Sequence, residues 1–310
     1  MYRLILICLS LCMVPGLAPA QTVPESRHVL KGRIIRALAL EPGDPNHILV
    51  GQKARKPGSG LVFKSLDGGK TWRTQNANAA LSPAATDVQA VAAASKSLLL
   101  AGTWKQGLFV STNGGGKFQP VRAVPSNDIR DLAVSGTTLY AASSQKGVFQ
   151  SNDKGKTWTA IGPARAALWS ITAAGSRLYA SSLRSGVFER NGEAWTAIFD
   201  QDKVYATAVN ESAGNSLALA AETGIYIRKK EGWQKAITGE TFADILFSPT
   251  GLLIAGSWEN GLVVLSPDGR LLKRLLAGKS VIHLHISGTR LFAATWGDGL
   301  HILPLKGVLP

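Results

Sequence analysis

The amino-acid sequence predicts an all-β protein: a seven-bladed β-propeller with four-stranded antiparallel blades. Two observations lead to this fold class. A glycine followed by two or three apolar residues opens a strand-like stretch seven times, at Gly60, Gly107, Gly147, Gly186, Gly224, Gly261 and Gly299. These glycines are 47, 40, 39, 38, 37 and 38 residues apart. A repeat of about 40 residues with strand content is typical of propeller blades, each of which is one small sheet.

One repeat, residues 128–161, shows the sequence pattern that predicts a blade. Short β-rich runs at 129–134, 138–142, 148–151 and 157–161 alternate with segments of Gly, Ser, Asn and Asp. Such runs and turns predict consecutive antiparallel hairpins. The same layout recurs over 168–198, 204–237 and 242–276, and with longer loops in the two earlier repeats.

The last repeat lacks a fourth strand. It offers strands at 281–286, 291–294 and 300–303, after which only residues 304–310 remain. Arg27–Lys31 is a short strand-like stretch without a hairpin partner, and we expect it to supply the missing outer strand. A ring left open would expose two unpaired sheet edges. The alternative is that residues 21–31 form a disordered tail.

The first twenty residues predict a secretory signal peptide rather than part of the fold. Arg3 precedes an apolar run over 4–14, and Ala18-Pro19-Ala20 is a small-x-small cleavage site. We therefore expect cleavage after Ala20, a periplasmic or secreted location, and one propeller domain over 21–310. The two cysteines, Cys8 and Cys12, lie in the leader, which excludes disulfides and thiolate chemistry from the mature chain.

The charge balance favours anionic partners. The chain has 34 Lys and Arg against 20 Asp and Glu, a net charge of +14. We expect an exported or membrane protein as the partner, with acidic proteins among the candidates, a glycan as a second class and peripheral contact with an anionic membrane as a third. Export argues against nucleic acid. We expect a monomer.

A local motif recurs in the predicted turns between third and fourth strands. Residues 65–72 and 151–158 fit Ser-x-Asp-x-Gly-x-Thr-Trp, and residues 111–118 are a drifted copy. Its side chains can accept turn amides, its glycine permits a positive φ, and its Trp can fill the gap between blades. We therefore interpret the following as structural residues: Ser65, Asp67, Gly69, Thr71 and Trp72; Ser111, Asn113 and Gly115; Ser151, Asp153, Gly155, Thr157 and Trp158.

These octapeptides resemble the Asp-box, or bacterial neuraminidase (BNR) repeat, of sialidases, sortilin-type receptors and xyloglucanases. They also resemble the photosystem II stability and assembly factor family and its exported bacterial relatives, to which a single seven-bladed ring behind a leader is most similar. That resemblance implies a binding platform without chemistry. The chain departs from the enzymes: Arg33-Ile34-Ile35 lacks the proline of the sialidase Arg-Ile-Pro segment, and no arginine triad is evident.

Two columns of polar side chains along the predicted inner strands indicate a candidate site. In register with the apolar column that begins at Ile35, the next positions are occupied by polar or aromatic residues in several blades. We expect these side chains to face the central channel. The candidate binding residues on the inner strands are Arg36, Arg130, Asp131, Trp169, Tyr205, Asp244 and His283.

A repeated Trp in the loops between second and third strands adds to this face. The residues are Trp104, Trp258 and Trp296, with the cations Lys105 and Arg184 in the same set of loops. Indole rings can stack on sugars, side chains or cations, and arginine can hold carboxylate or phosphate. The alternative is that each Trp fills the wedge between two blades.

The two channel acids, Asp131 and Asp244, together with His283, allow an enzyme interpretation. They would form a carboxylate pair with a proton carrier. The simpler interpretation is the polar lining of a water-filled channel, since no nucleophile or metal-ligand set accompanies them. We predict no metal and no cofactor. The sequence thus favours an exported, non-catalytic binding platform, with a carbohydrate-active enzyme of sialidase, glycosidase or lyase type as the alternative.

Overall fold

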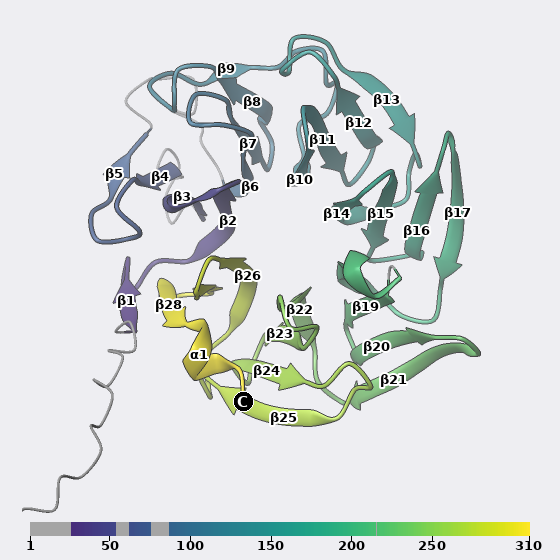
Figure 1. Ribbon diagram of the computed structural model, residues 1–310. Helices are drawn as coiled ribbons and strands as arrows, with labels where there is room; N and C mark the ends of the chain where they lie inside the picture. The colour runs from purple at the N-terminus through teal and green to yellow at the C-terminus, as the bar shows by residue number, and fades with distance from the viewer. Residues whose placement is uncertain (1–25, 54–61, 76–86, 215) are drawn as a thin grey trace, which may run out of the picture.

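The computed structural model describes residues 26–53, 62–75, 87–214 and 216–310. They form seven four-stranded sheets arranged in a ring around a central channel (Figure 1). The predicted seven-bladed propeller is therefore confirmed. The predicted signal peptide and the first strand-opening glycine, Gly60, lie outside the described residues. No helix in the described part of the chain has the length and apolar character needed to cross a membrane.

Each blade runs outward from the channel in chain order. Blade 1 contains β2 (Ile35–Glu41), β3 (Asp44–Gln52), β4 (Val62–Ser65) and β5 (Arg73–Thr74); blade 2 contains β6 (Val88–Ala93), β7 (Leu99–Thr103), β8 (Gly107–Ser111) and β9 (Gln119–Pro120). Blade 3 contains β10 (Ile129–Ser135), β11 (Thr138–Ser143), β12 (Gly147–Ser151) and β13 (Thr159–Gly162); blade 4 contains β14 (Leu168–Ala174), β15 (Arg177–Ser182), β16 (Gly186–Asn191) and β17 (Ala194–Phe199).

The remaining blades repeat this order. Blade 5 contains β18 (Val204–Asn210), β19 (Ser216–Ala221), β20 (Gly224–Lys229) and β21 (Gly232–Thr238), and blade 6 contains β22 (Phe242–Phe247), β23 (Leu253–Ser257), β24 (Leu262–Leu265) and β25 (Leu271–Leu275). Blade 7 contains β26 (Val281–Ser287), β27 (Arg290–Thr295) and β28 (Leu300–Pro304), to which β1 (Arg27–Val29) is added. A 3₁₀ turn (Glu211–Ala213) and α1 (Leu305–Val308) complete the described elements.

The N-terminal strand closes the ring. β1 pairs antiparallel with β28 (Figure 1). In this pairing His28 lies directly opposite His301. Residues from the two ends of the chain therefore complete one sheet, as the missing fourth strand predicted. This pairing covers the edge of β28, which would otherwise be open to another chain.

The recurring glycine has a steric cause. Gly186, which opens β16, has a φ of +69°, and a Cβ there would lie 1.9 Å from the carbonyl oxygen of Phe199 at the end of β17. Gly299 has a φ of +79°, and its Cβ would lie 2.5 Å from the carbonyl oxygens of Val29 and Leu30. The backbone after β1 thus lies against Gly299 in blade 7 in the same way that the end of the fourth strand lies against Gly186 in blade 4. Only glycine tolerates both the conformation and the close approach.

The apolar core lies between blades rather than within one of them. Among the described residues, each of the seven blade-to-blade interfaces has its own buried cluster; Phe242 and Val263 of blade 6, for example, pack with Ala218 and Ile225 of blade 5. The clusters of the other interfaces consist mainly of aliphatic residues, with a Phe or Tyr in several of them. Each blade therefore depends on both neighbours for burial of its two faces.

The Asp-box turns form dense local hydrogen-bond networks. In the turn after β12, Asp153 accepts hydrogen bonds from the amides of Lys156 and Thr157 and, at 2.6 Å, from the Thr157 hydroxyl. Ser151 Oγ accepts the amide of Gly155 at 2.9 Å. The Trp158 indole donates to the Gly155 carbonyl at 3.1 Å. These bonds lower the pKa of Asp153 to about 2, led by the one from the Thr157 hydroxyl.

The turn at Asp67 repeats these bonds residue for residue, and Asn113 accepts the Lys117 amide in the drifted copy. A shortened relative occurs after β24, where Ser266 donates to Asp268 and accepts the Arg270 amide. The box Trp72 packs in the cluster between blades 7 and 1, and Trp158 in the one between blades 2 and 3. The motif therefore stabilises its own turn through hydrogen bonds, and its Trp packs against the preceding blade.

Candidate functional site

A β-bulge at the same place in all seven inner strands positions the channel-facing side chains. The pairing skips one residue between Ile129 and Asp131 in β10, and at the equivalent step in β2, β6, β14, β18, β22 and β26. In a regular strand, neighbouring side chains point to opposite faces, and an inserted residue breaks that alternation. This is why both predicted columns, such as Arg130 and Asp131, reach the channel.

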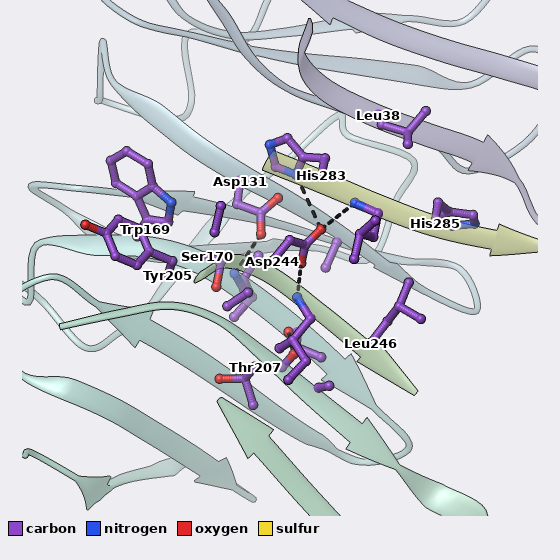
Figure 2. A pocket seen from close by; sticks show the side chains of 18 of the residues that line it. Leu38, Asp131, Trp169, Ser170, Tyr205, Thr207, Asp244, Leu246, His283 and His285 are labelled. Atoms are coloured by element: carbon purple, nitrogen blue, oxygen red, sulfur yellow. Dashed lines mark hydrogen bonds and ion pairs between the residues drawn. The ribbon is translucent and has the colours of Figure 1, made fainter. Parts of the chain in front are cut away.

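The channel contains a cavity of about 530 Å³. Among the predicted site residues, Arg36, Arg130, Asp131, Trp169, Tyr205, Asp244, Trp258 and His283 line it. A smaller cavity of about 240 Å³ along blades 1 to 3 shares Asp131 and His283 with it. The cavity wall combines polar groups near the starts of the inner strands with apolar side chains such as Leu246 further along (Figure 2). We call the group Arg36, Arg130, Trp169, Tyr205 and Trp258 the arginine end of the channel.

Arg36 is a half-buried cation of the arginine end. It donates a hydrogen bond to the Gln89 side chain of blade 2, and its guanidinium lies 5.0 Å from the centre of the Trp296 ring. Burial lowers the pKa of Arg36, the charge of Asp87 opposes that change, and the like charge of Arg130 lowers the pKa further. The two guanidinium groups therefore repel each other, and a bound anion would offset both the desolvation of Arg36 and this repulsion.

Arg130 is held from the side by Asp128. Its Nε and Nη2 atoms donate to Asp128 Oδ2 at 3.1 and 3.0 Å, and Ser144 donates to the same oxygen at 2.6 Å. The guanidinium lies 5.2 Å from the centre of the Trp169 ring in the next blade. The cation–π contact with the indole and the hydrogen bonds to a fixed carboxylate hold the Arg130 side chain in one orientation.

Two aromatic pairs flank the arginines. Trp169 and Tyr205 meet edge to face with their ring centres 5.7 Å apart, and Trp258 and Trp296 lie 5.6 Å apart at 59°. The first pair bridges blades 4 and 5, and the second bridges blades 6 and 7. Figure 2 shows Trp169 and Tyr205 side by side at one end of the cavity. Such rings offer large apolar area with little loss of side-chain entropy on binding.

Asp131 connects two inner strands. Its Oδ1 accepts the amide of Leu132 at 2.8 Å, and its Oδ2 accepts the amide of Ile171 in blade 4 at 2.9 Å. Burial raises the pKa of Asp131 to about 6, while the hydrogen bond from Ile171 and the nearby His283 oppose that increase. The inner strand of each blade is a sheet edge, so its N–H groups on the channel side need hydrogen-bond acceptors from outside the sheet. Asp131 supplies an acceptor for two of them.

Asp244 makes the same connection between blades 6 and 7. It accepts the amide of Ile245 at 2.8 Å and that of Leu284 at 2.7 Å. His283 Nδ1 lies 3.7 Å from Asp244 Oδ2, and Figure 2 shows this contact together with both amide bonds. Burial lowers the pKa of the neighbouring His285, against the charge of Asp244. The two acids therefore act on the backbone of the ring, a role that sequence reasoning did not assign to them.

Four predicted site residues do not line the cavity. Trp104 and Lys105 are exposed in the β7–β8 loop, where the Lys105 ammonium lies 5.0 Å from the indole centre. Arg184 is exposed in the β15–β16 loop. Trp296 does not line the cavity but reaches it through Trp258 and Arg36. The three loop tryptophans are thus not equivalent: Trp258 belongs to the arginine end, Trp296 contacts it through Trp258 and Arg36, and Trp104 does neither.

Sequence reasoning also missed a histidine cluster at the ring closure. His28 of β1, Asp298 of the β27–β28 turn and His301 of β28 place their potential ligand atoms within 4.8 Å of one another. These residues are far apart in the chain, and the pairing of β1 with β28 brings them together. The sequence did predict a closing strand that contains His28. It did not predict the register of that strand, which sets His28 opposite His301.

Comparison with known proteins supports the fold. Residues 70–208, less than half of the chain, match the DUF6242 beta propeller domain. No curated protein matches the chain by sequence.

Solved structures extend the likeness to the whole ring. YCF48 from Cyanidioschyzon merolae has a TM-score of 0.72 and 14% identity, covering 91% of this chain and 99% of that one. A structure of YCF48 bound to D1 peptide has a TM-score of 0.72 and 13% identity, covering 90% and 96%. PorZ of Porphyromonas gingivalis, a surface component of the type-IX secretion system, has a TM-score of 0.69 and 14% identity, covering 87% of this chain but 46% of its own.

An extracellular domain of a putative hybrid two-component system from B. thetaiotaomicron has a TM-score of 0.68 and 13% identity, covering 89% of this chain and 40% of that one. The neighbours therefore include the photosystem II assembly factor and bacterial extracellular propellers, as the Asp-box resemblance implied. At these identities the likeness is one of fold, and propellers of one fold serve many functions.

Proposed function

We propose that this protein is an exported binding platform that holds a carboxylate-bearing peptide segment of a protein partner at the arginine end of its channel. The observation that carries the proposal is the pairing of Arg36 and Arg130, each stacked on an indole, beside one cavity. Guanidinium groups favour carboxylates because they can bind them through two parallel hydrogen bonds.

The size and lining of the cavity support a short peptide segment. A volume of about 530 Å³ falls within the range of roughly 300–1,000 Å³ typical of small-ligand sites. Tyr205 and Trp258 line it and offer apolar contact next to the cations. YCF48, whose fold this chain shares, has been solved with a D1 peptide, which supports a peptide as the ligand class. Fold neighbours that are extracellular domains support an exported location.

The test is a quantitative pull-down from the exported fraction with the mature chain as bait. Arg36→Met removes the guanidinium that lies over Trp296 but keeps an unbranched side chain, and Lys154→Met removes one charge from an exposed Asp-box turn. We expect the Lys154→Met bait to recover the wild-type partner set and the Arg36→Met bait to lose it. Equal recovery by both baits, with equal thermal stability, would remove the arginine end as the binding surface.

The carbohydrate-active enzyme alternative depends on Asp131. A carboxyl with a pKa of about 6 is suited to general acid catalysis near neutral pH. Both of its oxygens, however, accept backbone amides, which favours the binding platform. Incubation of the wild type and Asp131→Asn with glycan substrates separates the two. Turnover by the wild type that disappears in the variant would establish the enzyme.

A further inference from the structure

We propose that His28, Asp298 and His301 form a binding site for one zinc-class divalent ion that ties the first strand of the ring to the last. This site is separate from the arginine end of the channel. In the described part of the chain it is the one group of three such side chains whose ligand atoms gather this closely.

The closing sheet creates the histidine pair. His28 and His301 are directly opposed across the antiparallel β1–β28 pairing. Their rings are stacked with centres 4.2 Å apart and an angle of 11° between planes. Cross-strand neighbours on one face of a sheet stand close enough to share a ligand.

Asp298 completes the set. The Asp298 amide donates to Thr295 Oγ1 at 3.1 Å, and Thr295 in turn donates to the Gly299 carbonyl at 2.7 Å, so the β27–β28 turn fixes the position of Asp298. Asp298 Oδ2 lies 3.0 Å from His301 Nε2, and its Oδ1 lies 3.5 Å from His28 Nε2. The His28 ring also donates to the Asp298 main-chain carbonyl.

The distances suit a tetrahedral ion. Ligand atoms that are each about 2.1 Å from a tetrahedral Zn²⁺ are separated from one another by roughly 3.4 Å. The two N···O separations, 3.0 and 3.5 Å, lie on either side of that value. Two imidazoles and one carboxylate are ligands that zinc, copper and nickel favour over magnesium or calcium. Three protein ligands leave one position for water or for a group of a partner.

The site is accessible and its histidines suit ligation. The His28 and Asp298 side chains are each 29% exposed, which gives an ion a path in from solvent. Each histidine would bind the ion as a neutral imidazole whose single proton is on Nδ1, so that the Nε2 lone pair, which now faces Asp298, is free to ligate.

One neighbouring cation competes for this place. Lys279 Nζ lies 2.9 Å from Asp298 Oδ2, and the lysine side chain is 42% exposed, so it can move into solvent. A bound ion must displace this ammonium or accept its repulsion. Removal of Lys279 should therefore strengthen metal binding, the opposite of what removal of a ligand does.

The test is calorimetric titration of the untagged, chelator-treated mature protein with Zn²⁺, with Mg²⁺ as the control ion. We expect one Zn²⁺ per chain and a melting temperature that rises with Zn²⁺ concentration, because an ion that binds only the folded ring stabilises it. Co²⁺ in place of Zn²⁺ should give the visible absorption of a tetrahedral site.

Variants decide whether this site is responsible. His28→Phe keeps a flat ring against His301 but cannot ligate, and we expect it to weaken Zn²⁺ binding at least tenfold, as loss of even an indirect partner of a ligand does. Lys279→Met should tighten binding several-fold. His283→Gln, which removes a channel histidine, is the matched control and should bind as the wild type does. Absence of Zn²⁺ binding by the wild type, or unchanged affinity in His28→Phe, would overturn the proposal.

Discussion

Replacing Asp244 with alanine tests the idea that channel carboxylates join neighbouring blades. The substitution removes the acceptor of two backbone amides, Ile245 in blade 6 and Leu284 in blade 7. Hydrogen bonds to a charged group each contribute about 1.5–3 kcal/mol. Because Leu284 lines the cavity, water can replace part of the loss, so we expect destabilisation by about 2–4 kcal/mol.

Asp244→Asn refines the measurement. The amide keeps one acceptor oxygen and turns an N–H₂ toward the other backbone N–H, so we expect about half the loss seen with alanine, roughly 1–2 kcal/mol. Asp200→Asn removes an exposed charge from the loop after β17 and serves as the control, with no change expected. Urea unfolding followed by tryptophan fluorescence gives the free energy of unfolding of each variant.

A second readout, the pKa of His285, reports the charge that Asp244 carries in the channel. Because Asp244 raises the pKa of His285 against its burial, the alanine variant should titrate His285 at lower pH than the wild type in NMR. A loss of less than about 0.5 kcal/mol in Asp244→Ala would refute the inter-blade role, since one hydrogen bond to a charge exceeds that value. An active-site assignment for the acid pair would then regain support.

Three further predictions test other parts of the ring. Gly186→Ala should lower the free energy of unfolding by about 2–4 kcal/mol in urea melts, because alanine there meets the Phe199 carbonyl at a positive φ; an unchanged midpoint would contradict the steric argument. The pKa of Asp131 is about 6 in the fold against 3.8 in the unfolded chain, so the free energy of unfolding should fall by at most about 3 kcal/mol as the pH rises from about 4 to 6. Asp131→Asn should remove this pH dependence. The Asp153 pKa is lowered to about 2, so its contribution is present above pH 4 and is lost between about pH 4 and 2, and Asp153→Asn should flatten that limb of the acid denaturation curve.

The blade pattern is local, which is why it could be predicted. Turn residues, strand-opening glycines and the Asp-box each act within one hairpin or between one hairpin and the next. A single repeat such as 128–161 therefore contains the local signals that specify the strands and turns of its blade. The closing role of Arg27–Lys31 followed from the same logic, because a count of strands left one place unfilled. The channel position of Arg130 and Asp131 was also predicted, although its cause, a bulge in every inner strand, was not.

The partners of the channel residues could not be predicted in this way. That Asp131 accepts the amide of Ile171, or that Arg36 stacks on Trp296 from the far end of the chain, depends on how one blade is rotated against the next. The equivalence drawn between Trp104 and Trp258 failed for the same reason: the two loops are alike in sequence, but one lies outside the cavity wall and the other forms part of it.

The sequence alone determined that seven similar sheets follow one another, because hydrogen bonding and turn sterics act over a few residues. It also left one strand place open in the last sheet, for which Arg27–Lys31 was the expected occupant. Tertiary structure decided which side chains meet across the channel and at the closure. Contacts such as His28 with His301 arise only when the ring is complete and the register of its final strand pair is set.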